Sequence, residues 1–197
     1  MPRVMKWIAA VSLLLMPVML ALYARFEMGL FLSMGITCGT IAYHFVMRLL
    51  VGWCYDRCMG NRADVQHPWF RQRSFELKLY ELLRVRAWKN HMPTYEPALF
   101  DPALHTWDEI AQAMCQSELV HETIVLLSFL PVTASIWLGD LPVFLITSVL
   151  AACFDLSFVL IQRYNRPTVI RLAQRQKRRA GHPGKRWIQS AAEVVSY

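Results

Sequence analysis

Charged residues are scarce in this sequence. They make up 18% of its 197 residues, whereas 55% are hydrophobic and the mean hydropathy is +0.29. The apolar residues gather into runs, so the composition excludes an ordinary soluble domain and indicates an integral membrane protein. A glycine-rich phosphate-binding loop is also missing, as is a second pair of metal ligands beside Cys54, Cys58 and His67. We therefore predict no bound metal and no bound cofactor.

Four apolar runs approach the length needed to cross a bilayer. They are residues 7–23, 28–47, 123–139 and 141–161. A membrane-spanning helix needs roughly 20 residues, so the sequence predicts an all-α membrane bundle of about four transmembrane helices. The first run follows Arg3 and Lys6 but has no small-residue cleavage site before Arg25. We therefore interpret it as a span and not as a signal peptide.

The runs divide the chain into four parts. These are two N-terminal transmembrane helices (1–50), a cytoplasmic interfacial segment (51–120), two C-terminal transmembrane helices with the site at their cytoplasmic ends (121–166), and a basic cytoplasmic tail (167–197). Apolar residues between Phe70 and Lys89 recur at helical spacing, which predicts an amphipathic helix in the membrane interface. Pro167 is expected to bend the chain after the fourth span.

Basic residues lie almost entirely on one side of these spans. Of the 21 Lys and Arg residues, Arg25 alone falls in a predicted outer loop. The positive-inside rule therefore places both termini and the middle segment in the cytoplasm, in a multi-pass protein of the cell membrane. The net charge of +7 favours contact with anionic inner-leaflet lipid. No nucleic-acid partner is expected, because no recognisable nucleic-acid-binding fold accompanies the charge.

The fourth run ends in the polar stretch Gln162-Arg163-Tyr164-Asn165-Arg166-Pro167. Arg163 and Arg166 are three residues apart and share a helix face at the predicted headgroup level. A positive-inside anchor is one interpretation of the two arginines. The ordered mixture of amide, phenol and guanidinium groups indicates instead a site that faces an anionic or sugar-bearing group.

Ionisable residues also occur at or within the ends of other runs. Glu118 and His121 are three apart, so the carboxylate could orient the imidazole as a general base, or the pair could be a solvated helix start. His44 and Arg48 either snorkel to the interface or line a polar cavity. Asp155 lies inside the fourth run, where it is either functional or hydrogen-bonded between helices.

Three blocks in a fixed order resemble one protein family. They are Val85-Arg86-Ala87-Trp88-Lys89 with Pro93, then Glu118-Leu119-Val120-His121 before Leu130-Pro131, then Gln162 to Pro167. Over about residues 75–179 they are similar to the glycosyl-4,4'-diaponeurosporenoate acyltransferases. The chain departs from the family pattern at Gln116-Ser117, Glu122 and Asp155, which leaves the acceptor open. The resemblance implies transfer of a fatty acyl group to a sugar hydroxyl of a membrane lipid, such as a carotenoid glycoside or another glycolipid.

We expect a role for each of the candidate residues in such a transfer. His121 would deprotonate the acceptor hydroxyl and Glu118 would orient its ring. Arg163, Arg166 and Lys89 would hold the phosphates of the acyl donor or stabilise the oxyanion. The remaining candidate contacts to the sugar or acyl chain are Trp88, Gln162, Tyr164 and Asn165. The donor would be a co-substrate such as acyl-CoA or acyl carrier protein.

Two other functions remain open from the sequence. One is a non-catalytic subunit that binds lipid or assists assembly. The other is a small proton-coupled transporter, with His44 and Asp155 as the proton-carrying pair. The sequence does not specify the acyl chain, its carrier, the sugar lipid or the oligomeric state.

Overall fold

The computed structural model describes residues 2–94 and 96–180, and these residues form helices and their connections without any strand. Within the described residues, four helical segments are long and apolar enough to cross a membrane. This confirms the predicted all-α membrane bundle. The longest connection between these segments is the one that joins the second to the third.

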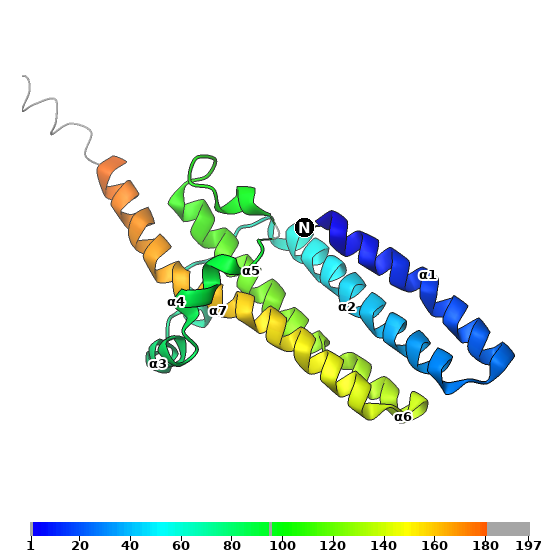
Figure 1. Cartoon of the computed structure of the whole chain (residues 1–197). Helices are drawn as coiled ribbons and strands as arrows, with labels where there is room; N and C mark the ends of the chain where they lie inside the picture. The colour runs from blue at the N-terminus through cyan, green and yellow to red at the C-terminus, as the bar shows by residue number, and fades with distance from the viewer. Residues whose placement is uncertain (1, 95, 181–197) are drawn as a thin grey trace, which may run out of the picture.

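Helices α1 (Pro2–Phe26) and α2 (Gly29–Met59) form an antiparallel hairpin (Figure 1). The link turns at Glu27, whose φ is 55° and whose N–H donates to the Tyr23 carbonyl at 2.7 Å. The two helices approach closely at Gly35, where a Cβ atom would lie 3.0 Å from the Leu20 side chain. Glycine therefore permits this packing.

Helices α5 (Trp107–Leu127) and α7 (Leu141–Ala180) form the second antiparallel pair (Figure 1). A capping box between Thr106 and Glu109 starts α5. The chain reverses through η4 (Leu130–Ala134) and α6 (Ser135–Leu138). Pro131 lies in the first turn of η4, so the third predicted span changes from an α-helix to a 3₁₀ helix at this position.

Pro167 does not end α7, which continues through this residue for 40 residues in total. The C-terminal part of the helix runs at an angle to the part before it (Figure 1), so the chain changes direction without leaving the helix. Hydrogen bonds from Arg163 and Arg166 tie the preceding turn to Glu118 of α5. This tertiary packing overrides the local preference of the residue before proline. The first part of the predicted tail is therefore helical, and residues 181–197 of that tail lie outside the described residues.

The segment between α2 and α5 consists of short helices, of which α3 and α4 lie beside α7 (Figure 1). They are η1 (Pro68–Phe70), α3 (Ser74–Leu82), α4 (Val85–Trp88), η2 (Lys89–His91) and η3 (Pro97–Phe100). The single amphipathic helix predicted from Phe70 to Lys89 is therefore interrupted. Arg84 adopts a left-handed conformation with a φ of 49°, which ends one helix and starts the next.

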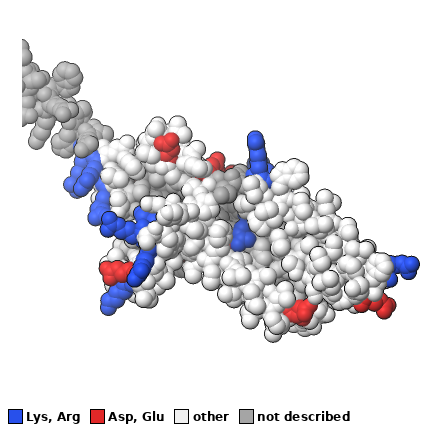
Figure 2. Space-filling view, in the orientation of Figure 1, with Lys and Arg blue, Asp and Glu red and all other residues white. Residues whose placement is uncertain are grey.

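The charged side chains are distributed unevenly over the visible surface. Figure 2 shows most of the basic ones at the end that carries α3, α4 and the C-terminal part of α7, with isolated basic groups elsewhere, one of them at the opposite tip. A broad surface with few charges separates the two ends. Together with the four apolar helices, this distribution is that of a membrane protein.

Candidate functional site

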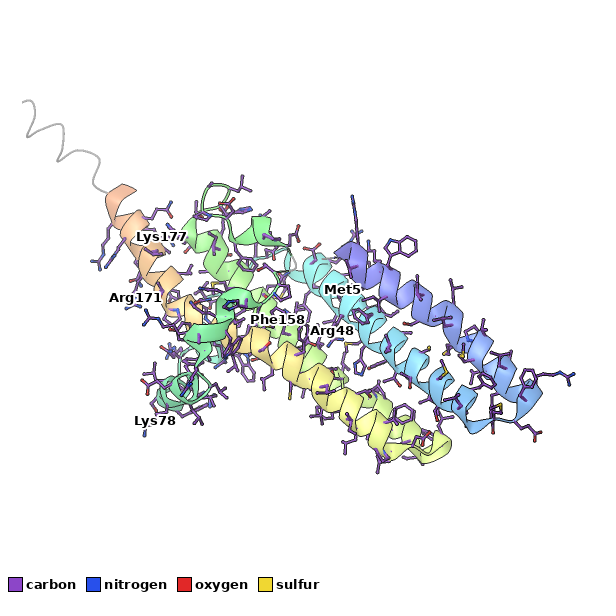
Figure 3. All side chains as sticks on the ribbon, viewed as in Figure 1. Met5, Arg48, Lys78, Phe158, Arg171 and Lys177 are labelled. Carbon is purple, nitrogen blue, oxygen red and sulfur yellow. The ribbon has the colours of Figure 1, made fainter. Side chains whose placement is uncertain are left out.

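Asp155 of α7 is the centre of a buried polar group formed by three helices. Its side chain is 1% exposed and lies between His121 of α5 and Arg48 of α2. His121 Nδ1 is 2.9 Å from Asp155 Oδ1. Arg48 donates to Oδ2 through Nε at 3.0 Å and also through Nη2. Figure 3 shows Arg48 on the part of α2 nearest to α5 and α7. The guanidinium compensates the carboxylate charge, which makes burial at this depth possible.

The imidazole of His121 is held in one orientation. Its ring stacks on Phe158 of α7, with centroids 4.6 Å apart and an interplanar angle of 15°. Nδ1 faces Asp155, whereas Nε2 has no hydrogen-bond partner among the described residues. The side chain is 20% exposed. One ring nitrogen is thus fixed by a carboxylate and the other is open, which is the geometry that a general base requires.

The predicted partnership of Glu118 with His121 is not found in the structure. Glu118 is fully buried and accepts hydrogen bonds from two guanidiniums of α7. Arg163 Nε donates to Oε1 at 2.8 Å, and Arg166 Nη1 donates to Oε2. A shared helix face was not sufficient to pair Glu118 with His121, because Glu118 lies opposite the guanidiniums of Arg163 and Arg166 on α7. Charge-assisted bonds to guanidinium are stronger than a bond to a neutral imidazole.

Arg163 and Arg166 also bind η1 and α3. Arg163 Nη1 donates to Glu76 Oε1 at 2.5 Å and Nη2 donates to the Trp69 carbonyl at 2.8 Å. Arg166 Nη2 donates to the Phe70 carbonyl at 2.6 Å. Two guanidiniums thus face the two carboxylates of Glu76 and Glu118, and we call these four residues the arginine–glutamate cluster.

The arginine–glutamate cluster does not fit the predicted phosphate-binding role. Arg166 is 2% exposed, and its guanidinium lies 5.1 Å from the centroid of the Phe70 ring. Arg163 is 16% exposed and uses all three of its nitrogens on protein oxygens. In this arrangement the two arginines join α7 to α5, η1 and α3.

Lys89, Tyr164 and Asn165 lie together at the side of α7 that faces η2. Lys89 Nζ donates to Asn165 Oδ1 at 2.6 Å and lies 4.7 Å from the centroid of the Tyr164 ring. Burial lowers the pKa of Lys89, and the nearby charge of Arg86 lowers it further. The three residues form a half-buried polar group beside the arginine–glutamate cluster.

The other predicted contact residues have separate partners. Gln162 Nε2 donates to Ser117 Oγ at 3.2 Å, between α7 and α5. Trp88 Nε1 donates to the Leu83 carbonyl at 2.9 Å, within the α3–α4 turn. His44 is buried one turn before Arg48, and Arg48 Nη1 donates to its carbonyl at 3.2 Å.

Several residues of the site were missed from the sequence. Glu76 was not among the predicted site residues, yet it is 3% exposed and accepts from Tyr80 OH at 2.7 Å. Burial, together with this hydrogen bond, raises the pKa of Tyr80. Trp69 Nε1 donates to Glu122 Oε2 at 2.9 Å. The four-residue spacing of Glu76 and Tyr80 was the available signal, since such residues share a helix face.

The possible metal ligands are not gathered into a site. Cys54 and Cys58 are exposed on α2, and His67 Nδ1 accepts from the Trp69 N–H at 3.2 Å. Within residues 2–94 and 96–180, no group of three side chains could hold a metal ion.

Comparison with known protein families matches residues 66–175 to the CrtO family, described as glycosyl-4,4'-diaponeurosporenoate acyltransferase. The fold and this match together identify a helical membrane protein of an acyltransferase family. The match covers more than half of the chain, and the chain belongs to this family. The matched residues include His121, Asp155 and the arginine–glutamate cluster, whereas Arg48 comes from α2, outside them. No curated protein and no solved structure matches the chain.

Proposed function

We propose that this protein transfers a fatty acyl group from a thioester donor to a sugar hydroxyl of a glycosylated membrane lipid. The observation that carries the proposal is the His121–Asp155 pair, at 2.9 Å, inside a bundle of the acyltransferase family. One nitrogen of the ring is held by a buried carboxylate. The other is open toward a substrate.

The reaction assigns one role to each member of the pair. Asp155, charge-compensated by Arg48, accepts a hydrogen bond from the protonated Nδ1 of His121, so Nε2 carries the lone pair. Nε2 takes the proton of the sugar hydroxyl while its oxygen bonds to the acyl carbon. The carbon–sulfur bond then breaks, and the imidazolium returns the proton to the leaving thiolate. The products are a sugar ester and a free thiol.

The position of the His121–Asp155 pair suits a reaction between an acyl thioester and a membrane lipid. Asp155 lies 14 residues into α7, which is about 21 Å along a helix that rises 1.5 Å per residue. The acyl chain could therefore lie against the apolar helices while its thioester reaches His121. The low dielectric at this depth strengthens the carboxylate–imidazole interaction. Phe158 shields one face of the ring from water.

The proposal also includes the orientation of the protein in the membrane and the side from which the acyl donor approaches. The basic residues support a cytoplasmic position for both termini, for α3 and for α4. Donors such as acyl-CoA or acyl carrier protein would then approach from the cytoplasm. Lys89, which is half-buried beside Tyr164, is the proposed contact for the polar part of the donor. Anionic inner-leaflet lipid would contact the exposed basic side chains of α7.

The test is acyl transfer by the purified full-length protein in nanodiscs. Radiolabelled palmitoyl-CoA is supplied with an alkyl β-D-glucoside, and formation of acylated glucoside is measured. His121→Ala should lower turnover by about 10²- to 10⁴-fold. His105→Ala is the matched control, because this half-buried histidine lies at the start of α5, near Glu109. Lipid binding without transfer would favour the non-catalytic subunit, and proton-coupled uptake in vesicles would favour the transporter.

A further inference from the structure

His44 and Ser148 are buried polar residues outside the mechanism above. His44 of α2 is 5% exposed and Ser148 of α7 is fully buried. Both ring nitrogens of His44 and the hydroxyl of Ser148 have no hydrogen-bond partner among the described residues. The large majority of buried side-chain polar atoms in proteins are hydrogen-bonded, so such atoms call for an explanation. Within a membrane span an ionisable side chain is expensive to bury, which makes a binding role the first explanation to examine.

The hydrogen bonds of the Arg48 guanidinium show which part of α7 lies beside His44. Nη1 donates to the His44 carbonyl at 3.2 Å and Nη2 donates to the Ala151 carbonyl at 3.4 Å. Ser148 precedes Ala151 by three residues, which is about 4.5 Å along the helix. Ser148 is also two turns from Asp155, so both side chains leave α7 on the same face.

A second hydrogen bond brings α5 to the same level. Tyr43, the neighbour of His44, donates from its hydroxyl to the Leu127 carbonyl near the end of α5 at 2.8 Å. Three helices therefore meet at the depth of His44. His44 lies one turn from Arg48 and Ser148 lies two turns from Asp155, both toward the links that join α1 to α2 and α6 to α7.

The chemistry of the open atoms selects the class of ligand. A neutral imidazole offers one donor and one acceptor, and a serine hydroxyl offers both. A sugar hydroxyl donates and accepts, so it can satisfy both kinds of atom. A carbonyl group can only accept. A phosphate or carboxylate would add a negative charge beside Asp155, whose charge Arg48 already compensates.

We infer that His44 and Ser148 bind the non-reacting hydroxyls of the acceptor sugar. This inference rests on the proposed function and adds to it the position of the sugar. Holding these hydroxyls would fix the sugar ring beside the Asp155 pair, so that one further hydroxyl reaches Nε2 of His121. His44 lies in α2, outside the residues matched to the family, so this part of the sugar site is supplied by the N-terminal hairpin.

The test measures sugar binding without turnover. The full-length protein is placed in phosphatidylglycerol nanodiscs, and its thermal unfolding is followed while dodecyl β-D-glucoside is added. A ligand that binds the folded protein raises the unfolding temperature. The parent should be stabilised by the glucoside and not by dodecanol, which has the same chain without the sugar. His44→Leu and Ser148→Ala should each weaken the apparent affinity about tenfold or more, because a buried hydroxyl then lacks a partner.

Two further variants make the test specific. His44→Gln keeps a donor and an acceptor and should retain part of the affinity, which also covers a failure of His44→Leu to fold. Thr40→Val is the matched control on the same buried face of α2. Its hydroxyl already donates to the Ile36 carbonyl at 2.9 Å, so its loss should leave glucoside binding unchanged.

Two outcomes would overturn the inference. Equal stabilisation of the parent, His44→Leu and Ser148→Ala would mean that the sugar binds elsewhere and that these atoms hold water only. No stabilisation of the parent by the glucoside would mean that the bundle has no sugar site. Glucoside binding that depends on His44, without acyl transfer by the parent, would support the inference and reject the proposed function.

Discussion

Replacement of Asp155 by asparagine distinguishes the role of this carboxylate from that of Glu118, a second buried carboxylate of the bundle. The amide can present its NH₂ group to Nδ1 of His121, which then accepts, so the ring proton moves to Nε2. Nε2 can no longer accept the proton of a hydroxyl. We expect a loss of turnover of about 10²- to 10⁴-fold, which at 1.36 kcal/mol per decade corresponds to about 3 to 5 kcal/mol of transition-state stabilisation.

Glu118→Gln should have a different main effect. Glu118 is fully buried and accepts from both Arg163 and Arg166. Loss of its charge leaves a buried guanidinium without compensation, which typically costs about 3 to 5 kcal/mol of stability. Turnover per folded molecule should fall much less than in Asp155→Asn. The two quantities are measured as kcat for acyl transfer and as the free energy of unfolding in a detergent titration.

A double variant removes the remaining ambiguity. Asp155→Asn also leaves Arg48 uncompensated, so it should destabilise the protein as well. Adding Arg48→Met removes the orphan cation, and stability should recover while kcat stays low. Asp108→Asn is the control, because this carboxylate pairs with Lys177 at the surface and should change neither quantity. Near-parent kcat in Asp155→Asn, or a recovery of kcat in the double variant, would refute the assignment of the base.

Three further predictions follow from other parts of the structure. Arg166→Lys should lower the free energy of unfolding by about 1.5–3 kcal/mol, because lysine cannot bond both Glu118 and the Phe70 carbonyl. Arg171→Lys, at an exposed position, should change it by no more than about 0.5 kcal/mol. Equal effects of the two variants would contradict the contacts of Arg166 in the arginine–glutamate cluster. The raised pKa of Tyr80 means that its contribution to stability is present below the ordinary tyrosine value of about 10 and is lost as the pH rises through the folded value. Tyr80→Phe should therefore flatten the alkaline fall of the unfolding temperature, and an unchanged profile would count against a buried phenol. In a cysteine-free background, an impermeant thiol reagent should label Glu27→Cys in intact cells and Asn90→Cys only in opened cells; the reverse pattern would invert the proposed topology.

The sequence was sufficient to predict the four helices that are long and apolar enough to cross a membrane. Apolar runs of this length have few stable alternatives, because backbone groups in lipid must be hydrogen-bonded within a helix. The same physics identified His44, Arg48 and Asp155 as residues of interest, since charges at this depth must be compensated. All three are buried or nearly so, and they meet between α2 and α7.

The choice of partners could not be predicted from spacing alone. Glu118 and His121 share a face of α5, but the alignment of α5 with α7 gives Glu118 to the arginines and His121 to Asp155. That alignment is a tertiary property, set by how two helices that are far apart in the sequence pack together. The continuation of α7 as a helix through Pro167 has the same origin. In both cases the local preference of the backbone or of neighbouring side chains was outweighed by tertiary contacts, which cannot be deduced from residue spacing.

The pairing of Arg48 with Asp155 has a consequence for biosynthesis. The two residues are 107 positions apart, so α2 leaves the ribosome long before α7. A lone charge at the centre of a membrane helix costs about 2.5–3.5 kcal/mol at the translocon. Arg48 and Asp155 lie nearer to the ends of their apolar runs, so each unpaired charge has a smaller but still unfavourable cost. The first hairpin should therefore remain weakly anchored until the last helix is made and the pair closes. A nascent chain arrested before α7 should be extracted by alkaline carbonate more readily than the finished protein, and Arg48→Leu should abolish this difference.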